Sequence, residues 1–415
     1  MQLPLQSVGA RALREIQIPN QGGAPELRHQ WLLPLARTIE GNFKLGLCLK
    51  EFELRLACPW TGGCNENLTA YQAGITRQCN SFGNFLNVYA PSLRSLEVPY
   101  PLGCNFLDQS WPDLKKLAIC SLDTTLDLDR PEINMDDLLQ GLDVVFLGTL
   151  LLSPKLEELH IKTTTLSGEN VLVNLRPRCS ALKKLTIRTL EMQESTIRVL
   201  LRAPRGLTDF ELTNEEPLEP YDHDSDDEGL PPPRRLPHLT TIYKNLKHQS
   251  ATLERLSIHG AAFSPNQCLT TGHHSFRGFS CLKSMKVDVA MLLGWTDCEH
   301  IAKNSDESKS LEPRAIGTLL PDTLCELNFY IDWIFDFRKK KDYVYQIIAG
   351  IIEARRRLVC LKSVKISAIY PHCNDCFYTI PGMQTRSDLI DELDRAKKLA
   401  TDNSIEFEYF AKQVP

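Results

Sequence analysis

Residues 180–187 read Ser180-Ala181-Leu182-Lys183-Lys184-Leu185-Thr186-Ile187, and they contain the pattern that recurs along the whole chain. The pattern is leucine, two polar residues, leucine, one polar residue, isoleucine. Side chains alternate between the two faces of a β-strand, so Leu185 and Ile187 point to the same side. Leu182 enters the same interior from the turn before the strand. The stretch therefore predicts a short strand that is buried on one face only.

Close variants of this unit recur from one end of the chain to the other. In several units a proline stands two places before the first leucine (Pro91, Pro112 and Pro154), where it ends a preceding helix and starts an extended segment. Residues 192–201 and 343–358 carry apolar residues three or four positions apart, which predicts helices. The repeated positions are Leu13, Ile16, Ile18; Leu49, Phe52, Leu54; Leu93, Leu96, Val98; Leu114, Leu117, Ile119; Leu156, Leu159, Ile161; Leu182, Leu185, Ile187; Leu207, Phe210, Leu212; Leu253, Leu256, Ile258; Leu282, Met285, Val287; Leu324, Leu327, Phe329; and Leu361, Val364, Ile366.

The spacing of the units predicts an α/β repeat array. Successive first leucines are between 21 residues (Leu93 to Leu114) and 46 residues (Leu207 to Leu253) apart. Parallel strands stack about 4.8 Å apart, so the surplus residues of long units must form helices or loops on the outer side. We expect one solenoid over residues 1–415, with a curved parallel sheet on the concave side and helices and loops on the convex side. The long gap after Leu207 could also hide a weak unit at Leu239 with Ile242.

Two segments differ from the repeats. Residues 206–233 contain ten acidic residues and no Lys or Arg, and three prolines follow one another at 231–233. Such a segment cannot bury a core, so residues 214–236 are expected to form a disordered insertion loop. Within it, Ser225 has an acidic residue three positions later, which is a possible phosphorylation site; a plain solvated loop is the alternative. Residues 384–415 are expected to cap the array with a helix, whose apolar side carries Leu389, Ile390, Leu393, Ala396 and Leu399, and a strand.

Composition and charge limit the class of protein. Of the 415 residues, 42% are hydrophobic and 24% charged, which is typical of a globular chain, and the net charge of -5 gives no strong basic field for nucleic acid. Residues 1–5 show no secretory signal. The most apolar stretch, residues 138–152, is too short to span a bilayer and predicts a buried helix. We therefore expect a cytoplasmic or nuclear monomer that does not contact membranes, with its 14 cysteines reduced.

Residue patterns typical of catalysis or metal binding are few. The sequence contains no phosphate-binding glycine loop, no His-Glu-x-x-His and no Gly-x-Ser-x-Gly motif. His372, Cys373 and Cys376 offer three possible zinc ligands where a structural site needs four, so a loop with free thiols is favoured. Acidic residues fall on strand faces or in the acidic segment, where solvated charge explains them. We expect no catalytic residue, no metal and no cofactor, and a hydrolase is the remote alternative.

The remaining candidate site is the concave face of the sheet. Residues that alternate with the buried strand positions point there, and they form neighbouring patches of mixed charge without an aromatic platform for stacking bases. Protein recognition fits such a face better than nucleic-acid binding, which needs a basic face with aromatic residues. Each position is also compatible with an ordinary solvated strand residue. The candidates are Glu158, His160, Lys162, Lys184, Thr186, Arg188, Asp209, Glu211, Arg255 and His259.

The repeated unit, its irregular spacing and the upstream proline resemble the leucine-rich-repeat region of fungal F-box proteins. The resemblance covers roughly residues 10 to 370; the F-box itself is not recognisable, because repeat-like sequence begins by Leu13. In that family the F-box docks on a Skp-type adaptor of a cullin ubiquitin ligase and the repeats hold the substrate. The resemblance thus implies a non-catalytic protein-binding module. Its more specific implication is the substrate-recognition subunit of a ubiquitin ligase. The alternative is a structural scaffold with no link to ubiquitin.

Overall fold

The chain divides into two compact units in the computed structural model, Met1–Arg205 (unit 1) and Gly206–Pro415 (unit 2). Residues 215–236 of the predicted acidic segment, with Ser225, lie outside the residues that the structure describes, as do the cysteines at 373 and 376 and the first predicted unit at Leu13. Asn214, the first residue of the predicted loop, is the last residue of a strand. The described residues are 41–53, 90–100, 111–121, 142–143, 150–167, 175–214, 239–260, 274–293, 312–332, 342–370 and 386–413, with positions 88, 148 and 237.

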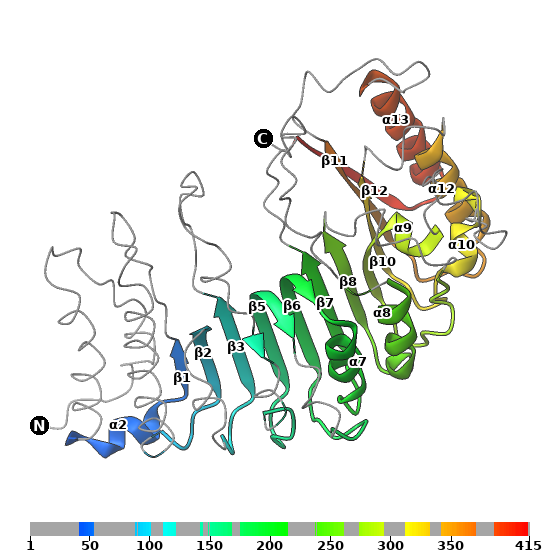
Figure 1. Ribbon diagram of the computed structural model, residues 1–415. Helices are drawn as coiled ribbons and strands as arrows, with labels where there is room; N and C mark the ends of the chain where they lie inside the picture. Colours follow the sequence, from blue (N-terminus) through cyan, green and yellow to red (C-terminus); the bar gives the residue numbers. More distant parts are fainter. Residues whose placement is uncertain are drawn as a thin grey trace, which may run out of the picture. The chain divides into compact units, whose positions relative to one another are not determined.

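Unit 1 is built on a parallel sheet (Figure 1). Its strands follow the order β1-β2-β3-β5-β6, and β4 pairs with β5 at one end. The short strand β4 lies inside residues 138–152, so the prediction of a helix there is wrong at Leu142 and Asp143. The elements are α2 (Phe43–Cys48), β1 (Glu51–Glu53), β2 (Ser95–Tyr100), β3 (Lys116–Ser121), β4 (Leu142–Asp143), β5 (Glu158–Ser167), β6 (Lys184–Met192) and α7 (Glu194–Arg202).

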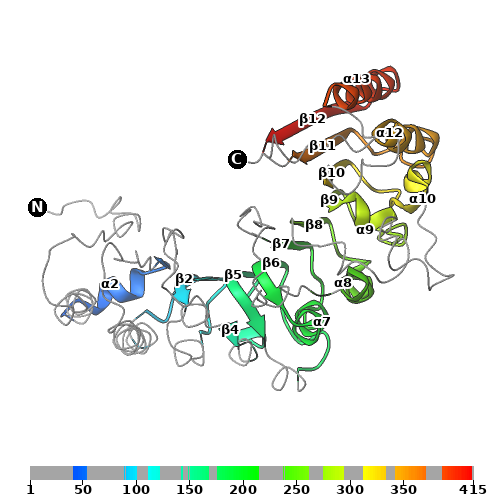
Figure 2. The same ribbon diagram turned by 45° about the horizontal axis from the view of Figure 1, so that its top comes forward.

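Unit 2 repeats this design, with more helices among the described residues. Its parallel strands follow one another in chain order from β7 to β12, and the helices of this unit lie together on one side of the sheet (Figures 1 and 2). The elements are β7 (Asp209–Asn214), α8 (Leu239–Leu246), η4 (Lys247–Gln249), β8 (Arg255–Gly260), β9 (Ser284–Asp288), α9 (Val289–Leu293), η6 (Pro313–Ala315), α10 (Ile316–Leu319), β10 (Glu326–Asp332), α12 (Tyr343–Glu353), β11 (Ser363–Tyr370), α13 (Arg386–Asp402) and β12 (Glu406–Gln413).

The α/β class and the open parallel sheets agree with the sequence-based prediction. Helices α7 and α12 fall where the spacing of apolar residues predicted them. The suggested weak repeat at Leu239 and Ile242 is wrong, because both residues belong to helix α8 and are buried on it. An apolar pair three residues apart suits a helix as well as the turn and strand of a repeat, so its spacing could not decide between them.

The repeated apolar positions form the interior of both sheets. Leu182, Leu185 and Ile187 are fully buried, with 0% of their surface exposed. The three corresponding positions are buried in each predicted unit from Leu114 to Ile366. Full burial of such a side chain stabilises the fold by about 1.5–3 kcal/mol. The predicted phase of the strands is therefore confirmed in both units, and this apolar face of each sheet holds the core.

A tight turn and a shared hydrogen bond introduce most of the described strands. The amide of Leu114 donates to the carbonyl oxygen of Trp111 at 3.3 Å, so that Pro112 occupies the second position of a turn, which its fixed φ favours. The amides of Lys183 and Lys184 then both donate to the carbonyl oxygen of Glu157, at 2.8 and 2.9 Å. Corresponding pairs of amides donate to the carbonyl oxygens of Lys50, Arg94, Lys115, Thr208, Glu254, Lys283 and Cys325.

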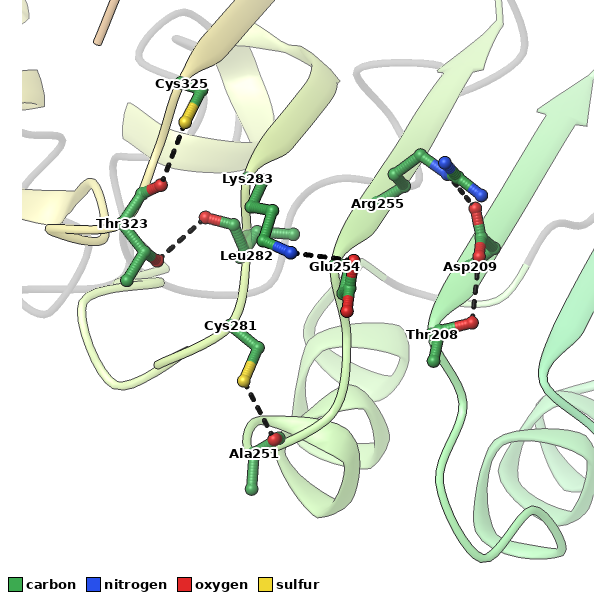
Figure 3. A network of polar contacts seen from close by, with 10 residues as sticks. All are labelled: Thr208, Asp209, Ala251, Glu254, Arg255, Cys281, Leu282, Lys283, Thr323 and Cys325. Atoms are coloured by element: carbon green, nitrogen blue, oxygen red, sulfur yellow. Dashed lines mark hydrogen bonds and ion pairs between the residues drawn. The ribbon is translucent and has the colours of Figure 1, made fainter. Parts of the chain in front are cut away.

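Polar side chains at equal positions of successive repeats also contact one another. In unit 2 the Thr323 hydroxyl donates to the carbonyl oxygen of Leu282 at 2.9 Å, and Lys283 Nζ lies 3.0 Å from Glu254 Oε2 (Figure 3). In unit 1 Lys183 Nζ lies 2.9 Å from Glu157 Oε1, and this hydrogen bond lowers the pKa of the Glu157 carboxyl group. Exposed ion pairs add little stability, because water screens them. Their regular placement instead favours one register between neighbouring strands.

Two glycines allow an unusually close helix contact in unit 2. A Cβ atom added to Gly350 of α12 would lie 2.0 Å from the carbonyl oxygen of Arg314, and one added to Gly317 of α10 would lie 2.2 Å from the carbonyl oxygen of Gly350. Both distances are far below van der Waals contact, and the clashing atoms are backbone atoms. The helices before β10 and β11 can therefore approach only because neither position carries a side chain.

A buried carboxylate of α13 holds the beginning of α12. Glu392 is 0% exposed, and its Oε1 atom accepts hydrogen bonds from the amides of Val344 and Tyr345, at 2.5 and 3.1 Å. These amides belong to the first turn of α12, where amides lack partners within the helix and a negative charge is favourable. The predicted apolar side of α13 is wrong at Ile390, which is 39% exposed; Glu392 is buried in its place beside Leu393 and Ala396.

We predict that Glu392→Ala lowers the free energy of unfolding by about 2 kcal/mol, because two buried amides lose their acceptor. The neighbouring exposed residue Asp391 provides the matched control, since Asp391→Ala removes one carboxylate from the same helix. Chemical denaturation of both variants measures the difference. Equal stabilities would contradict the capping role of Glu392.

Candidate functional site

Each sheet has a second face, here called the polar face, whose residues alternate with the buried apolar positions. On β5 and β6 the strand register brings six of the candidate residues together in unit 1. Pairs opposite one another on adjacent parallel strands are about 4.8 Å apart at their backbones. The pairs are Glu158 with Lys184, His160 with Thr186, and Lys162 with Arg188.

Lysine and arginine side chains surround the middle of this face. Lys116 on β3 stands opposite Glu158, so two lysines flank this carboxylate in one row across three strands. Lys162 and Arg188 stand together in a parallel row four residues further along the strands. These four residues, Lys116, Lys162, Lys184 and Arg188, form the cationic patch. Lys116 was missed in the sequence, although it precedes Leu117 as Lys184 precedes Leu185, and this shared position could have revealed it.

His160 lies inside the cationic patch. Its side chain is 26% exposed, and its Nε2 atom lies 3.5 Å from Glu158 Oε2, at the outer limit of a hydrogen bond. Burial is the main cause that lowers the pKa of His160 below its ordinary value of 6.5, and the charges of Lys184 and Lys116 lower it further. Glu158 acts in the opposite direction. The ring is therefore mostly neutral at pH 7.

Thr186 occupies its predicted place but is not exposed as predicted. Its position in the register puts it on the polar face beside His160, yet only 6% of its surface is accessible. The side chain is short, and Thr186 lies on its strand between Lys184 and Arg188. Its hydroxyl oxygen is buried and makes no hydrogen bond with the described residues. Most buried hydroxyl groups in proteins do have such a partner.

The unit 2 candidates form an ion pair and a contact with an aromatic residue. Asp209 on β7 pairs with Arg255 on β8 and accepts a hydrogen bond from Thr208 at 2.9 Å (Figure 3). The hydrogen bond to Asp209 raises the pKa of Arg255. Glu211 is in register with Ser257 in the next row. The Asp209–Arg255 pair ties two strands together, so these two residues have a structural role of their own.

His259 stacks on Tyr330, a residue that sequence reasoning missed. Their ring centroids are 4.5 Å apart and their planes differ by 22°. The Oγ1 atom of Thr213 lies 3.4 Å from His259 Nε2, and Lys286 Nζ lies 5.0 Å from the centroid of the Tyr330 ring. The prediction that this face lacks aromatic stacking is therefore wrong. Tyr330 follows Leu327 by three residues, as His259 follows Leu256, which is the signal that could have revealed the pair.

Other polar-face residues of unit 2 extend the same surface. Lys365 Nζ on β11 lies 2.6 Å from Glu408 Oε2 on β12, and this hydrogen bond raises the pKa of Lys365. Ser367 Oγ lies 3.5 Å from Asn328 Oδ1. Phe410 on β12 is 57% exposed. Beyond the stack, this face therefore carries paired charges and one exposed aromatic ring.

The described thiols and buried histidines show no arrangement for metal binding. Cys325 and Cys360 are free thiols, and no cluster of His, Cys, Asp and Glu in these ranges could hold a metal ion. His274 is buried against Tyr243, with ring centroids 4.6 Å apart, and its Nε2 atom lies 3.5 Å from Thr240 Oγ1. This histidine packs among the helices of unit 2. Nor is any helix in the described ranges long and apolar enough to cross a bilayer.

Comparison with known proteins gave no relatives from which a function could be transferred. The chain matches no model of a protein family, and it matches no curated protein. The arguments about function therefore depend on the two polar faces and on the residues that the strand register brings together there.

We predict that His160 titrates below pH 6.5, which NMR can measure by assigning its ring signal through its loss in His160→Gln. The unfolded chain then binds this proton more readily than the folded one. As the pH falls below about 6.5, wild type should therefore lose stability relative to His160→Gln. Above that pH the difference between the two should be constant. A stability difference between wild type and His160→Gln that does not change with pH would contradict this placement of His160. A pKa of His160 above 6.5 would contradict it too.

Proposed function

We propose that this chain is a non-catalytic protein-binding module, a leucine-rich-repeat-like array that holds a partner protein on the polar faces of its sheets. The observation that supports it best is the His259–Tyr330 stack with Lys286 beside the Tyr330 ring. The opposite face of the same sheet is filled by the buried repeat positions and the helices. The polar face is thus the broad surface of the sheet that remains for recognition.

Two aromatic rings held against each other are suited to protein recognition. Tyrosine is enriched at the centres of protein interfaces, because its ring buries a large area and loses little conformational freedom on binding. In the His259–Tyr330 stack each ring restricts the other, which lowers that entropic cost further. The contacts of Thr213 and Lys286 hold the pair from two further strands. A partner would therefore meet a preorganised surface.

Charge on this face favours a protein partner over a nucleic acid. Asp209 pairs with Arg255, and Glu408 pairs with Lys365, so cations and anions alternate across the sheet. Nucleic acid needs a surface of one sign that neutralises successive phosphates. A mixed surface instead selects a partner with a complementary pattern of charge.

The proposal includes a curved array with the polar face on its inner side. Helices are about 10 Å wide, whereas neighbouring strands are about 4.8 Å apart, so repeats with helices on one side spread apart there. A link to a ubiquitin ligase is implied by the family resemblance alone. Stable co-purification of a Skp-type adaptor would support that link, and its absence would favour a structural scaffold.

We predict that Tyr330→Ala and Lys286→Glu each remove the same set of proteins from those captured by the immobilised chain in a native extract. Arg356→Glu, which changes an exposed cation after α12, is the matched control and should leave that set unchanged. Quantitative mass spectrometry measures the captured set, and melting temperatures confirm folding. Tyr330 truncation should weaken capture about tenfold or more, as expected for a central aromatic contact. If all three variants capture the same proteins as wild type, the proposal is contradicted.

A further inference from the structure

The cationic patch of unit 1 has a composition that suits an anionic group. Lys116, Lys162, Lys184 and Arg188 lie on three adjacent strands around the carboxylate of Glu158, and the carboxylate of Glu97 on β2 borders them, with its Oε1 atom 3.9 Å from Cys120 Sγ. Neighbouring strands are about 4.8 Å apart and alternate residues of a strand about 6.7 Å apart, so two rows that are four residues apart enclose an area of about 10 Å by 13 Å between the four backbones. His160 and Thr186 lie between the two rows of cations. The patch is thus positive and centred on two groups able to form hydrogen bonds.

The buried hydroxyl of Thr186 is the second, independent observation. It makes no hydrogen bond with the described residues, although it is buried. A buried hydroxyl without a partner is unfavourable, and an anionic oxygen is the strongest acceptor that it could meet. Lys184 and Arg188 stand on both sides of it along β6. Both side chains are long enough to reach an anion bound at this hydroxyl.

We infer that the cationic patch binds an acidic segment of a partner protein, with one Asp or Glu carboxylate accepting a hydrogen bond from Thr186 between Lys184 and Arg188. The inference rests on the proposed function, because it assigns a partner chemistry to one of the polar faces. Its ligand is an unmodified carboxylate segment of a few residues. The size of the patch sets this length.

Neighbouring acidic residues exclude a long polyanion from this face. Glu97 on β2 is in register with Ala118 on β3, and Glu51 on β1 is in register with Ser95 on β2. Glu97 Oε1 lies 3.9 Å from Cys120 Sγ on β3, so carboxylates border the positive area on the side of β2. A nucleic acid that crossed the sheet would bring its phosphates next to these carboxylates. A short acidic segment of a protein stays within the positive area.

The test measures fluorescence anisotropy of labelled hexaglutamate with the full chain. Hexaglutamate should bind and hexaglutamine should not, and affinity should fall as salt increases. Lys184→Glu with Arg188→Glu should weaken binding at least tenfold, because the double change reverses half of the cations in the patch. The control Lys44→Glu with Arg198→Glu makes the same change of net charge on exposed residues of α2 and α7 and should alter affinity less than about twofold.

Thr186→Val separates a role in binding from a role in folding. The change keeps the shape of the side chain and removes the hydroxyl, so hexaglutamate affinity should fall about fivefold to tenfold. The melting temperature should stay the same or rise, because a buried group without a hydrogen bond is lost. Wild-type affinity in Thr186→Val would overturn the inference. The inference would also be overturned if the two double variants weakened hexaglutamate binding equally. It would be overturned likewise if hexathymidylate bound as tightly as hexaglutamate.

The outcome is independent of the unit 2 experiment. Loss of captured proteins in Tyr330→Ala together with absent hexaglutamate binding would overturn this inference and leave the proposed function standing. Hexaglutamate binding that depends on Thr186 and on the cations of β6 supports the inference whatever Tyr330→Ala does.

Discussion

One-sided burial of the strands is the constraint on which the rest of the structure depends. Leu185 and Ile187 must both enter the core, so the residues between and beside them must point the other way. Parallel pairing then places equal repeat positions next to one another, strand after strand. Every row on the polar face is a consequence of this register. A shift of one residue would exchange the two faces completely.

The rows of the polar face differ in what they do. At the start of the strands, pairs such as Glu157 with Lys183 and Glu254 with Lys283 join successive repeats, so their charges are already engaged in structure. On the strands themselves, ion pairs such as Asp209 with Arg255 stand beside groups of another kind, the His259–Tyr330 stack and the buried hydroxyl of Thr186. This division explains how a face with many ion pairs can still offer distinct surfaces to a partner.

The sequence predicted the features that depend on neighbouring residues. The phase of the strands follows from alternation, and helices α7 and α12 follow from apolar residues three or four positions apart. It did not predict contacts between distant residues. His259 and Tyr330 meet across an intervening strand, and the burial of Glu392 depends on the amides of α12. A glutamate in the sequence predicts an exposed position, so Glu392 was not expected on the buried side of α13, and Ile390 was wrongly expected there.

The most direct test of the central claim compares Leu185→Asp with Lys184→Asp by chemical denaturation. Leu185 is fully buried, so its replacement puts an unpaired charge into the core and should lower the free energy of unfolding by more than about 3 kcal/mol, or prevent folding. Lys184 lies on the polar face, and its replacement should change that free energy by roughly half a kcal/mol. Similar losses for the two variants would contradict one-sided burial and the polar face derived from it.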